Sequence, residues 1–286
     1  MSMVITVVTK DVVVQVSDVQ LTSLDDGKPL DEKQRKSALV VGTDAAFVIG
    51  WTGFAKSSNK EFKTGEWLFN TLNHIKAYEK PLVDILGDLT GLADYAFNRL
   101  PDPQAIKGTH FVLGGWHRRN GDTELFTSVI FNDLLLNEQH QFIESPTVDT
   151  KFLYSLGAFR PVESPHFVRV DSPGRTEDKL KWTEEPMRVL RIVMSNQGGE
   201  QAIIRACVDV IRRAAGRTTT ISKEVIVATL KKCGDFTTDY LSEKDKEERL
   251  VPDIITPNAA TTQGTIKAIV SGDEVSGTFN AQILRR

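Results

Sequence analysis

The chain opens with two runs of β-branched residues, at positions 3–9 and 12–17, which are separated by the polar pair Lys10-Asp11. Such residues favour extended backbone, and two runs joined by a short polar break are typical of an antiparallel hairpin. Nearly every position in both runs is apolar, so we expect strands whose two faces are both covered. The opening of the chain therefore predicts a sheet inside a layered protein.

Shorter apolar runs predict further strands. Residues 22–37 are rich in turn-forming and charged residues and are expected to form a surface loop. Strands at 39–41 and 47–49 then lead into a glycine-containing turn at 50–53. Further strands are predicted at residues 109–115, 125–132, 141–144, 152–156, 166–170 and 224–230, with a closing hairpin formed by 265–271 and 275–284.

Apolar residues recur at helical spacing in four segments that occur in two pairs. The first pair is 64–75 with 82–97, and the second is 183–195 with 199–215. Strands and helix pairs are too segregated for alternating βαβ units, and short turns between strands favour antiparallel sheets. We therefore predict an α+β fold, a four-layer αββα sandwich in which helix pairs cover two packed sheets.

The same pattern predicts two regions of unequal size. Residues 1–235 contain all of the predicted core elements and would form one domain. Residues 236–286 would form a C-terminal extension, made of the charged linker at 241–249 and the closing β-hairpin. The chain contains no internal repeat and no low-complexity tract.

Composition and charge remove several classes of function. A net charge of −3 argues against an electrostatic nucleic-acid binder. The chain has two cysteines, Cys207 and Cys233, which are too few for a disulfide framework and are expected to be reduced thiols. No apolar run is long enough to span a bilayer, and no targeting segment precedes the first strand, so we expect a cytoplasmic protein without a membrane partner.

Metal and cofactor chemistry are not predicted. The five histidines are scattered and no Cys-x-x-Cys pair occurs. Neither a Walker A motif nor a Gly-x-Gly-x-x-Gly motif is present. The candidate chemistry is instead at the start of the chain, where Ser2, Asp18 and Lys36 are followed by the turn Gly50-Trp51-Thr52-Gly53. A hydroxyl, an acid, a lysine and a glycine turn at these spacings make chemical sense together as a nucleophile, charged groups beside it and an oxyanion donor.

These landmarks resemble proteasome-type subunits of the N-terminal-nucleophile (Ntn) hydrolases, especially their bacterial forms. In that family a Thr or Ser follows the start methionine or a propeptide, and a valine-rich hairpin ends in a small residue and Asp. A loop, a Lys, a strand and a glycine turn come next. The sixteen positions from Ser2 to Asp18 match this pattern without a gap. The segment Ser17-Asp18-Val19-Gln20-Leu21-Thr22 is also similar to the signature of an uncharacterised bacterial branch.

The resemblance implies a specific chemistry. Removal of Met1 would expose the α-amine of Ser2, which is partly neutral near pH 7 and acts as the base for its own hydroxyl. Lys36 would disfavour protonation of the amine, and Asp18 would hold the lysine by a charge-assisted hydrogen bond. Gly53, at the end of the glycine turn, would help to stabilise the oxyanion. The implied reaction is hydrolysis of a peptide or small amide through an acyl-enzyme, in a homo-oligomer that forms a closed ring.

Several alternatives remain open from sequence. Met3 is a second candidate initiator, Thr6 is a second candidate nucleophile, and Lys33 competes with Lys36. Active members of the family carry an Asp and a Ser three residues apart after the last helix, whereas residues 212–221 offer threonines and no Asp, Asp209 falls too early, and Ser222 has no matched partner. The alternative function is therefore an inactive proteasome-fold assembly or binding protein, and a third is an acylase that acts on a small amide.

Overall fold

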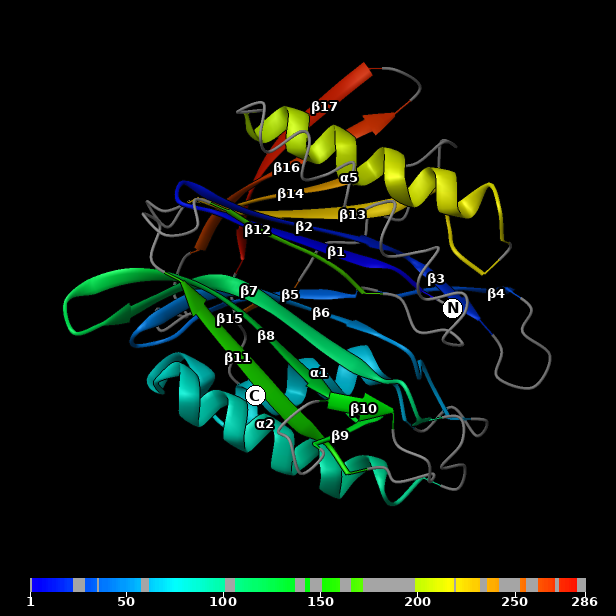
Figure 1. Ribbon diagram of the computed structural model, residues 1–286. Helices are drawn as coiled ribbons and strands as arrows, with labels where there is room; N and C mark the ends of the chain where they lie inside the picture. Colours follow the sequence, from blue (N-terminus) through cyan, green and yellow to red (C-terminus); the bar gives the residue numbers. More distant parts are fainter. Residues whose placement is uncertain are drawn as a thin grey trace.

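The computed structural model shows two large β-sheets packed face to face, with helices on their outer surfaces (Figure 1). Its helices and strands follow the order of the predicted elements through most of the chain. The structure describes residues 2–22, 29–34, 36–57, 62–100, 106–136, 142–144, 151–159, 166–171, 199–218, 220–231, 236–241, 253–255, 262–270 and 273–281.

The N-terminal hairpin is the centre of the first sheet, which we call sheet 1. Strands β1 (Val4–Thr9) and β2 (Val12–Asp18) pair antiparallel, as the β-branched runs predict. Both strands are buried along their whole length, which confirms the expectation of two covered faces. Sheet 1 has the strand order β12-β1-β2-β13-β14-β16-β17. Its other strands are β12 (His166–Asp171), β13 (Val225–Lys231), β14 (Phe236–Leu241), β16 (Thr262–Val270) and β17 (Asp273–Ala281).

The second sheet, sheet 2, has the strand order β11-β8-β7-β6-β5-β15. Five of its strands pair antiparallel, and the β7–β8 turn uses Asn120 and Gly121, both at positive φ, as Asn-Gly turns do. The short strand β15 joins the edge of the sheet in parallel with β5. The strands are β5 (Ser37–Val41), β6 (Ala45–Thr52), β7 (His110–Arg119), β8 (Asp122–Phe131), β11 (Leu153–Phe159) and β15 (Asp253–Ile255).

The stretch predicted as a surface loop contains a strand, so this prediction is wrong in part. Strand β4 (Pro29–Lys33) pairs antiparallel with β3 (Gln20–Thr22), outside the two large sheets. A two-stranded ribbon that is not sandwiched between layers needs no apolar alternation, so its composition resembles that of a loop. A second small ribbon is formed by β9 (Leu134–Leu136) and β10 (Phe142–Glu144).

Between the two sheets lies a layer of side chains, which we call the inter-sheet layer. Towards the β1–β2 turn it is apolar, and the Trp116 indole N–H donates to the carbonyl of Thr9 across the sheets at 3.1 Å. Alternation along each strand sends successive side chains to opposite faces, so each strand feeds both this layer and an outer one. The buried apolar residues of this end are Val8, Val13, Leu39, Val48, Trp116, Leu125, Ala228, Leu230 and Phe236.

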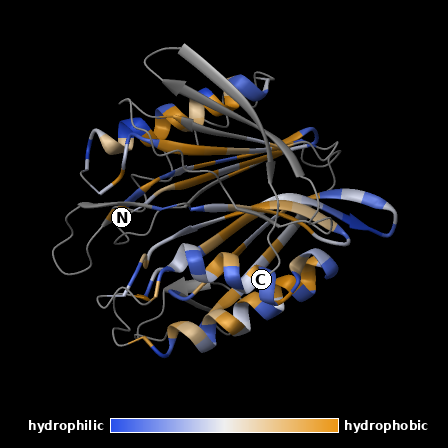
Figure 2. Ribbon diagram, turned by 180° about the vertical axis from the view of Figure 1, so that it is seen from behind, coloured by the Kyte–Doolittle hydropathy of each residue, from blue (hydrophilic) through white to orange (hydrophobic). Residues whose placement is uncertain are grey.

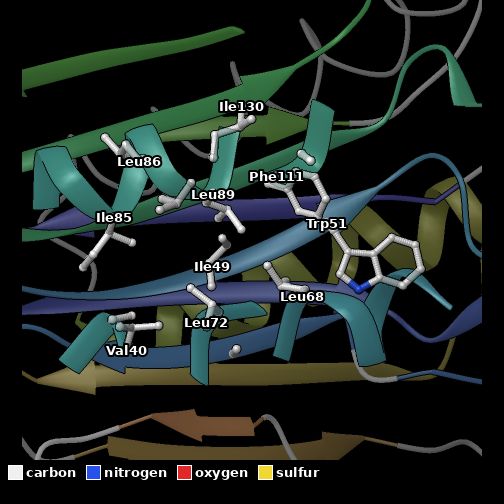
Figure 3. Packing of buried hydrophobic residues seen from close by; sticks show 14 of the residues in the cluster. Val40, Ile49, Trp51, Leu68, Leu72, Ile85, Leu86, Leu89, Phe111 and Ile130 are labelled. Atoms are coloured by element: carbon white, nitrogen blue, oxygen red, sulfur yellow. The ribbon is translucent and has the colours of Figure 1, made fainter. Parts of the chain in front are cut away.

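Helices α1 (Thr64–His74) and α2 (Leu82–Phe97) cover the outer face of sheet 2 and are joined by the short 3-10 turn Ala77–Glu79. Figure 3 shows Leu68 and Leu72 of α1, with Leu89 of α2, packed against strand residues such as Ile49 and Phe111. Asp44 from the β5–β6 turn accepts the Leu82 N–H at 2.8 Å and so caps α2. Both helices are therefore in the predicted places.

Helix α5 (Glu200–Ala215) lies on the outer face of sheet 1, and its apolar stripe packs on β1, β2 and β13. Figure 2 shows the hydrophobic residues of this helix and of the strands facing each other, with hydrophilic residues turned outward. The predicted helix at 183–195 lies outside the described residues. The chain therefore has an α+β fold with two largely antiparallel sheets, and a helix pair on this second outer face stays a prediction.

The closing hairpin is present as the antiparallel pair β16–β17, which joins sheet 1 through β14. Because β14 is also hydrogen-bonded to β13, sheet 1 contains strands from both sides of the predicted domain boundary. Most of the charged linker, residues 242–249, lies outside the described residues. Within the described part of the chain, no helix is long and apolar enough to cross a membrane.

Candidate functional site

Asp18 is the hub of the candidate site. Its side chain is fully buried at the end of β2, and its two oxygens accept four hydrogen bonds. The Oδ1 atom accepts from the Met3 backbone N–H at 2.8 Å and from Lys36 Nζ at 3.0 Å. The Oδ2 atom accepts from the backbone N–H groups of Gln20 at 3.1 Å and Ser222 at 3.5 Å. One carboxylate thus joins four segments of the chain.

Lys36 is the positive partner of this carboxylate and is also fully buried. Its ammonium donates to the Gln20 carbonyl at 2.6 Å and lies 5.9 Å from the centroid of the Trp51 ring. Burial lowers the pKa of Lys36 below its ordinary value, and the attraction of Asp18 opposes this effect without cancelling it. Lysines whose pKa is lowered by burial serve as proton-transfer groups in some active sites, and ion pairs with a purely structural role also shift pKa values.

The ion pair joins the two sheets. Lys36 immediately precedes β5 of sheet 2, and the Trp51 N–H of β6 donates to its carbonyl at 3.1 Å. Asp18 ends β2 of sheet 1. The approach of the two charges therefore depends on how sheet 1 lies over sheet 2, and sequence spacing alone does not reveal it.

Ser2 lies beside this pair. It directly precedes Met3, and it is 4% exposed. Because the Met3 nitrogen and Lys36 Nζ are bonded to the same oxygen, the two nitrogens lie within about 6 Å of each other. Met3 packs with the apolar residues under α5. The structure thus brings Asp18 and Lys36 together next to the backbone N–H of Met3, the residue that follows Ser2, and a role for Ser2 in the site stays a prediction.

The two glycines of the predicted turn lie in different surroundings. Gly53 has a φ of +97° and faces the backbone of Gly108 and Thr109, where a Cβ atom would lie 2.6 Å from the Gly108 carbonyl oxygen. Gly50 instead lies beside the candidate site, where a Cβ atom would lie 3.0 Å from the Lys36 carbonyl oxygen. The glycine that contacts Lys36 is therefore Gly50, and a role for Gly53 in the reaction stays a prediction.

The structure also decides between residues that the sequence left open. Of the two candidate lysines, Lys36 forms an ion pair with Asp18, whereas the side chain of Lys33 lies outside the described part of the chain. Thr6 is fully buried within β1 and accepts a hydrogen bond from Gln15 at 3.0 Å. Asp209 is exposed on α5 and does not reach the site.

Ser222, for which the sequence offers no matched partner, lies beside Asp18. It contacts Asp18 through its backbone, and its hydroxyl accepts the Glu224 N–H at 2.9 Å. It is brought there because β13 pairs with β2 in a register that puts Val225 opposite Asp18. Only this long-range pairing shows the contact, so the sequence carries no local signal for it.

Two further acid–histidine pairs lie in sheet 2. His110 Nε2 is 2.9 Å from Asp133 Oδ1, with both side chains nearly buried, and His117 Nε2 is 3.2 Å from Asp44 Oδ2. Among the described residues, no group of three or more His, Cys, Asp or Glu side chains is arranged to hold a metal ion. The hydrogen-bonding capacity of Asp18 is itself taken up by protein donors.

Comparison with known proteins reveals a likeness in fold. No protein-family model matches the chain, and no curated protein matches its sequence. A solved structure of an Anbu mutant from Hyphomicrobium sp. strain MC1 is similar, with a TM-score of 0.51 and 12% identity over 86% of this chain and 90% of that one. Anbu (ancestral beta-subunit) from Yersinia bercovieri matches with a TM-score of 0.46 and 12% identity, over 80% and 81%. The first of these matches shows that the chain has a proteasome-like fold.

Proposed function

We propose that this chain is a proteasome-like Ntn hydrolase that cleaves amide bonds with the hydroxyl of Ser2 after Met1 has been removed. The observation that carries the proposal is the buried Asp18 carboxylate, which binds the Lys36 ammonium and the N–H that follows Ser2 on the same oxygen. A charged pair is costly to bury, and a structural role alone is served as well by apolar residues. The Asp18–Lys36 pair lies close to the start of the chain, where Ser2 would supply the nucleophilic hydroxyl, and this position supports a chemical role for the pair.

In the proposed reaction, the Ser2 oxygen attacks the carbonyl carbon of a peptide or small amide. Its proton passes to the freed α-amine of the same residue, which later gives a proton to the leaving amine. Lys36 keeps that amine neutral by charge repulsion, and Asp18 holds Lys36 in place. A backbone N–H of the Gly50–Gly53 turn stabilises the oxyanion, with Gly50 the member nearest Lys36. Water then hydrolyses the ester bond to Ser2.

The architecture that we propose around this site is the four-layer αββα sandwich, with residues 183–195 supplying the second helix over sheet 1. We further propose that copies of the chain assemble into a closed homo-oligomeric ring, which encloses the site. The domain would comprise residues 1–235, and residues 236–286 would extend sheet 1 beyond it. Oligomeric state is measured directly by sedimentation or native mass spectrometry, and a monomer would contradict the ring.

One observation favours a second candidate, an inactive proteasome-fold assembly or binding protein. Residues 212–222 include Thr218, Thr220 and Ser222 but no carboxylate, and Asp209 is exposed on α5. In the described part of this segment, the hydroxyls of Thr218 and Thr220 are 2.8 Å apart and bond to each other. Without an acid there, the α-amine of Ser2 has fewer groups to orient it.

Two measurements separate these candidates. Intact-mass spectrometry shows whether Met1 is removed, and a panel of fluorogenic peptide amides reports hydrolysis. The proposal expects a free Ser2, turnover that disappears in Ser2→Ala, and activity in Ser2→Thr, which keeps a hydroxyl on the same atom. Retained Met1, or equal turnover in Ser2→Ala and the parent chain, would leave the inactive assembly protein as the better account.

A further inference from the structure

Strand β2 carries two polar side chains into the inter-sheet layer just before it reaches Asp18. Gln15 and Ser17 point towards sheet 2, whereas Val14 and Val16 point towards α5. All four residues are buried. Buried polar groups are costly unless they form hydrogen bonds, so their partners show what they hold in place.

Gln15 hydrogen-bonds across the two sheets. Its Nε2 donates to Thr6 Oγ1 of the neighbouring strand at 3.0 Å and to the Val112 carbonyl of β7 at 3.2 Å. The first bond lies within sheet 1, and the second joins sheet 1 to sheet 2. The Oε1 atom, for which the described residues offer no hydrogen-bond donor, lies so close to Gly50 that a Cβ atom there would be 2.6 Å from it. The amide is therefore wedged between β1, β2, β6 and β7.

Ser17 forms a second link between the sheets. Its hydroxyl lies 3.4 Å from the hydroxyl of Ser37, the first residue of β5. Ser17 and Ser37 are the chain neighbours of Asp18 and Lys36, respectively. Both inter-sheet links therefore lie on β2 just before Asp18: Gln15 is three residues before it and Ser17 one residue before it.

We propose that Gln15, assisted by Ser17, is a positioning residue that fixes the register of sheet 1 over sheet 2 and so sets the geometry of the Asp18–Lys36 pair. Apolar packing is non-directional and holds two sheets together without choosing one lateral position. A hydrogen bond has a preferred distance and angle, so the Gln15 bond to β7 selects a position. Its consequence for catalysis rests on the proposed function, whereas its effect on the ion pair does not.

The test compares two near-isosteric variants of one network. Gln15→Met keeps the length and volume of the side chain and removes both donated hydrogen bonds. Thr6→Val keeps the inter-sheet bond and removes the bond within sheet 1, so it is the matched control. The readout is the pH titration of the Lys36 Cε–H signal in protein labelled with ¹³C-lysine, assigned by its absence in Lys36→Met. A change in stability alone does not move this midpoint.

Methionine at position 15 keeps water out of the inter-sheet layer, so Lys36 stays buried. If Asp18 moves away from Lys36 in this variant, the lysine loses an attraction that raises its pKa. We therefore expect the Lys36 midpoint to fall by about half a unit or more in Gln15→Met and to be unchanged in Thr6→Val. An unchanged or raised midpoint in Gln15→Met, or equal shifts in both variants, overturns the proposal.

Ser17→Ala supplies a second measurement that does not depend on the folding of Gln15→Met. It removes one hydroxyl and the second inter-sheet link, so the Lys36 midpoint should fall by a smaller amount. An unchanged midpoint in this variant overturns the part assigned to Ser17. The peptide reporters are run on the same samples: absent turnover in the parent chain counts against the hydrolase, while the titration still decides the role of Gln15.

Discussion

The inter-sheet layer has two ends that differ in chemistry. Near the β1–β2 turn it is filled by apolar side chains, among them Val13, Leu39 and Leu125. At the other end the same two sheets meet through Gln15, Ser17 and the Asp18–Lys36 pair with its partners. The apolar end is held mainly by burial of apolar area, which is favourable in many arrangements, with the Trp116–Thr9 hydrogen bond as its one directional contact among those described. The polar end requires one arrangement, because its hydrogen bonds and charges are satisfied only there.

The largest effect is expected from breaking the charge pair on its acidic side. Asp18→Ala leaves the Lys36 ammonium buried without its counter-charge and also removes the acceptor of three backbone N–H groups. We expect the free energy of unfolding to fall by about 3–5 kcal/mol, measured by urea denaturation. Lys36→Met should cost less, because Asp18 keeps its three backbone donors. Equal losses for the two variants would contradict the role of Asp18 as the hub.

A substitution at the apolar end should weaken the fold without touching the site. Leu125→Ala opens a cavity in the inter-sheet layer, and we expect the free energy of unfolding to fall by about 2–4 kcal/mol. The Lys36 midpoint, followed by NMR, should match that of the parent chain. A shift of that midpoint would mean that packing at the apolar end also sets the geometry of the Asp18–Lys36 pair, and the two ends of the layer would then not differ in role.

Gly50→Ala should have an intermediate effect, because the new methyl group has no space. Its Cβ would lie 2.6 Å from Gln15 Oε1 and 3.0 Å from the Lys36 carbonyl oxygen. We expect a loss of about 1–3 kcal/mol in the free energy of unfolding, together with a moved Lys36 midpoint. Gly87→Ala is the control, because Gly87 lies in α2 and no atom is near its missing Cβ. This variant should raise the free energy of unfolding by about 0.5–1 kcal/mol. Destabilisation of both variants would show that the effect at Gly50 is not specific to the site.

The smallest effect concerns pH. The pKa of Lys36 is lowered in the folded chain by burial, so between that pKa and 10.5 the unfolded chain binds more protons than the folded one. The contribution of Lys36 to stability should therefore rise as pH increases through this window, by at most about 1.4 kcal/mol per pH unit. Below the lowered pKa the cost of burying the charge is fully present. The measurement is the difference in unfolding free energy between the parent chain and Lys36→Met at several alkaline pH values; a difference that falls with pH would contradict it.

The elements inside the layers were easier to predict from the sequence than those outside them. The valine-rich strands and the helices at α1, α2 and α5 are readable from sequence, because their apolar spacing reflects which face is buried. The β3–β4 ribbon was not readable, because it lies outside the layers. Thr64 is the first residue of α1, and its hydroxyl donates to the Phe54 carbonyl at 2.6 Å. Local signals locate helices more reliably than they locate helix ends.

The site was partly readable for a different reason. The spacing of Ser2, Asp18 and Lys36 matches a pattern known from a family, so the residues were named although nothing local links them. The contact of Ser222 with Asp18, the position of Gly50 beside Lys36 and the link from Gln15 to β7 all depend on pairing between distant segments. No periodicity within one segment encodes such pairing.

The most direct test of the central claim is to locate an acyl group on the protein. The chain is incubated with an activated peptide ester, quenched with acid, digested and sequenced by tandem mass spectrometry, with Lys36→Met and Ser2→Ala run alongside. The account predicts an acyl group on the hydroxyl of an N-terminal Ser2 in the parent chain, a reduced amount in Lys36→Met and none at that position in Ser2→Ala. An unmodified Ser2 that still follows Met1, or an acyl group found only on surface lysines, would contradict it.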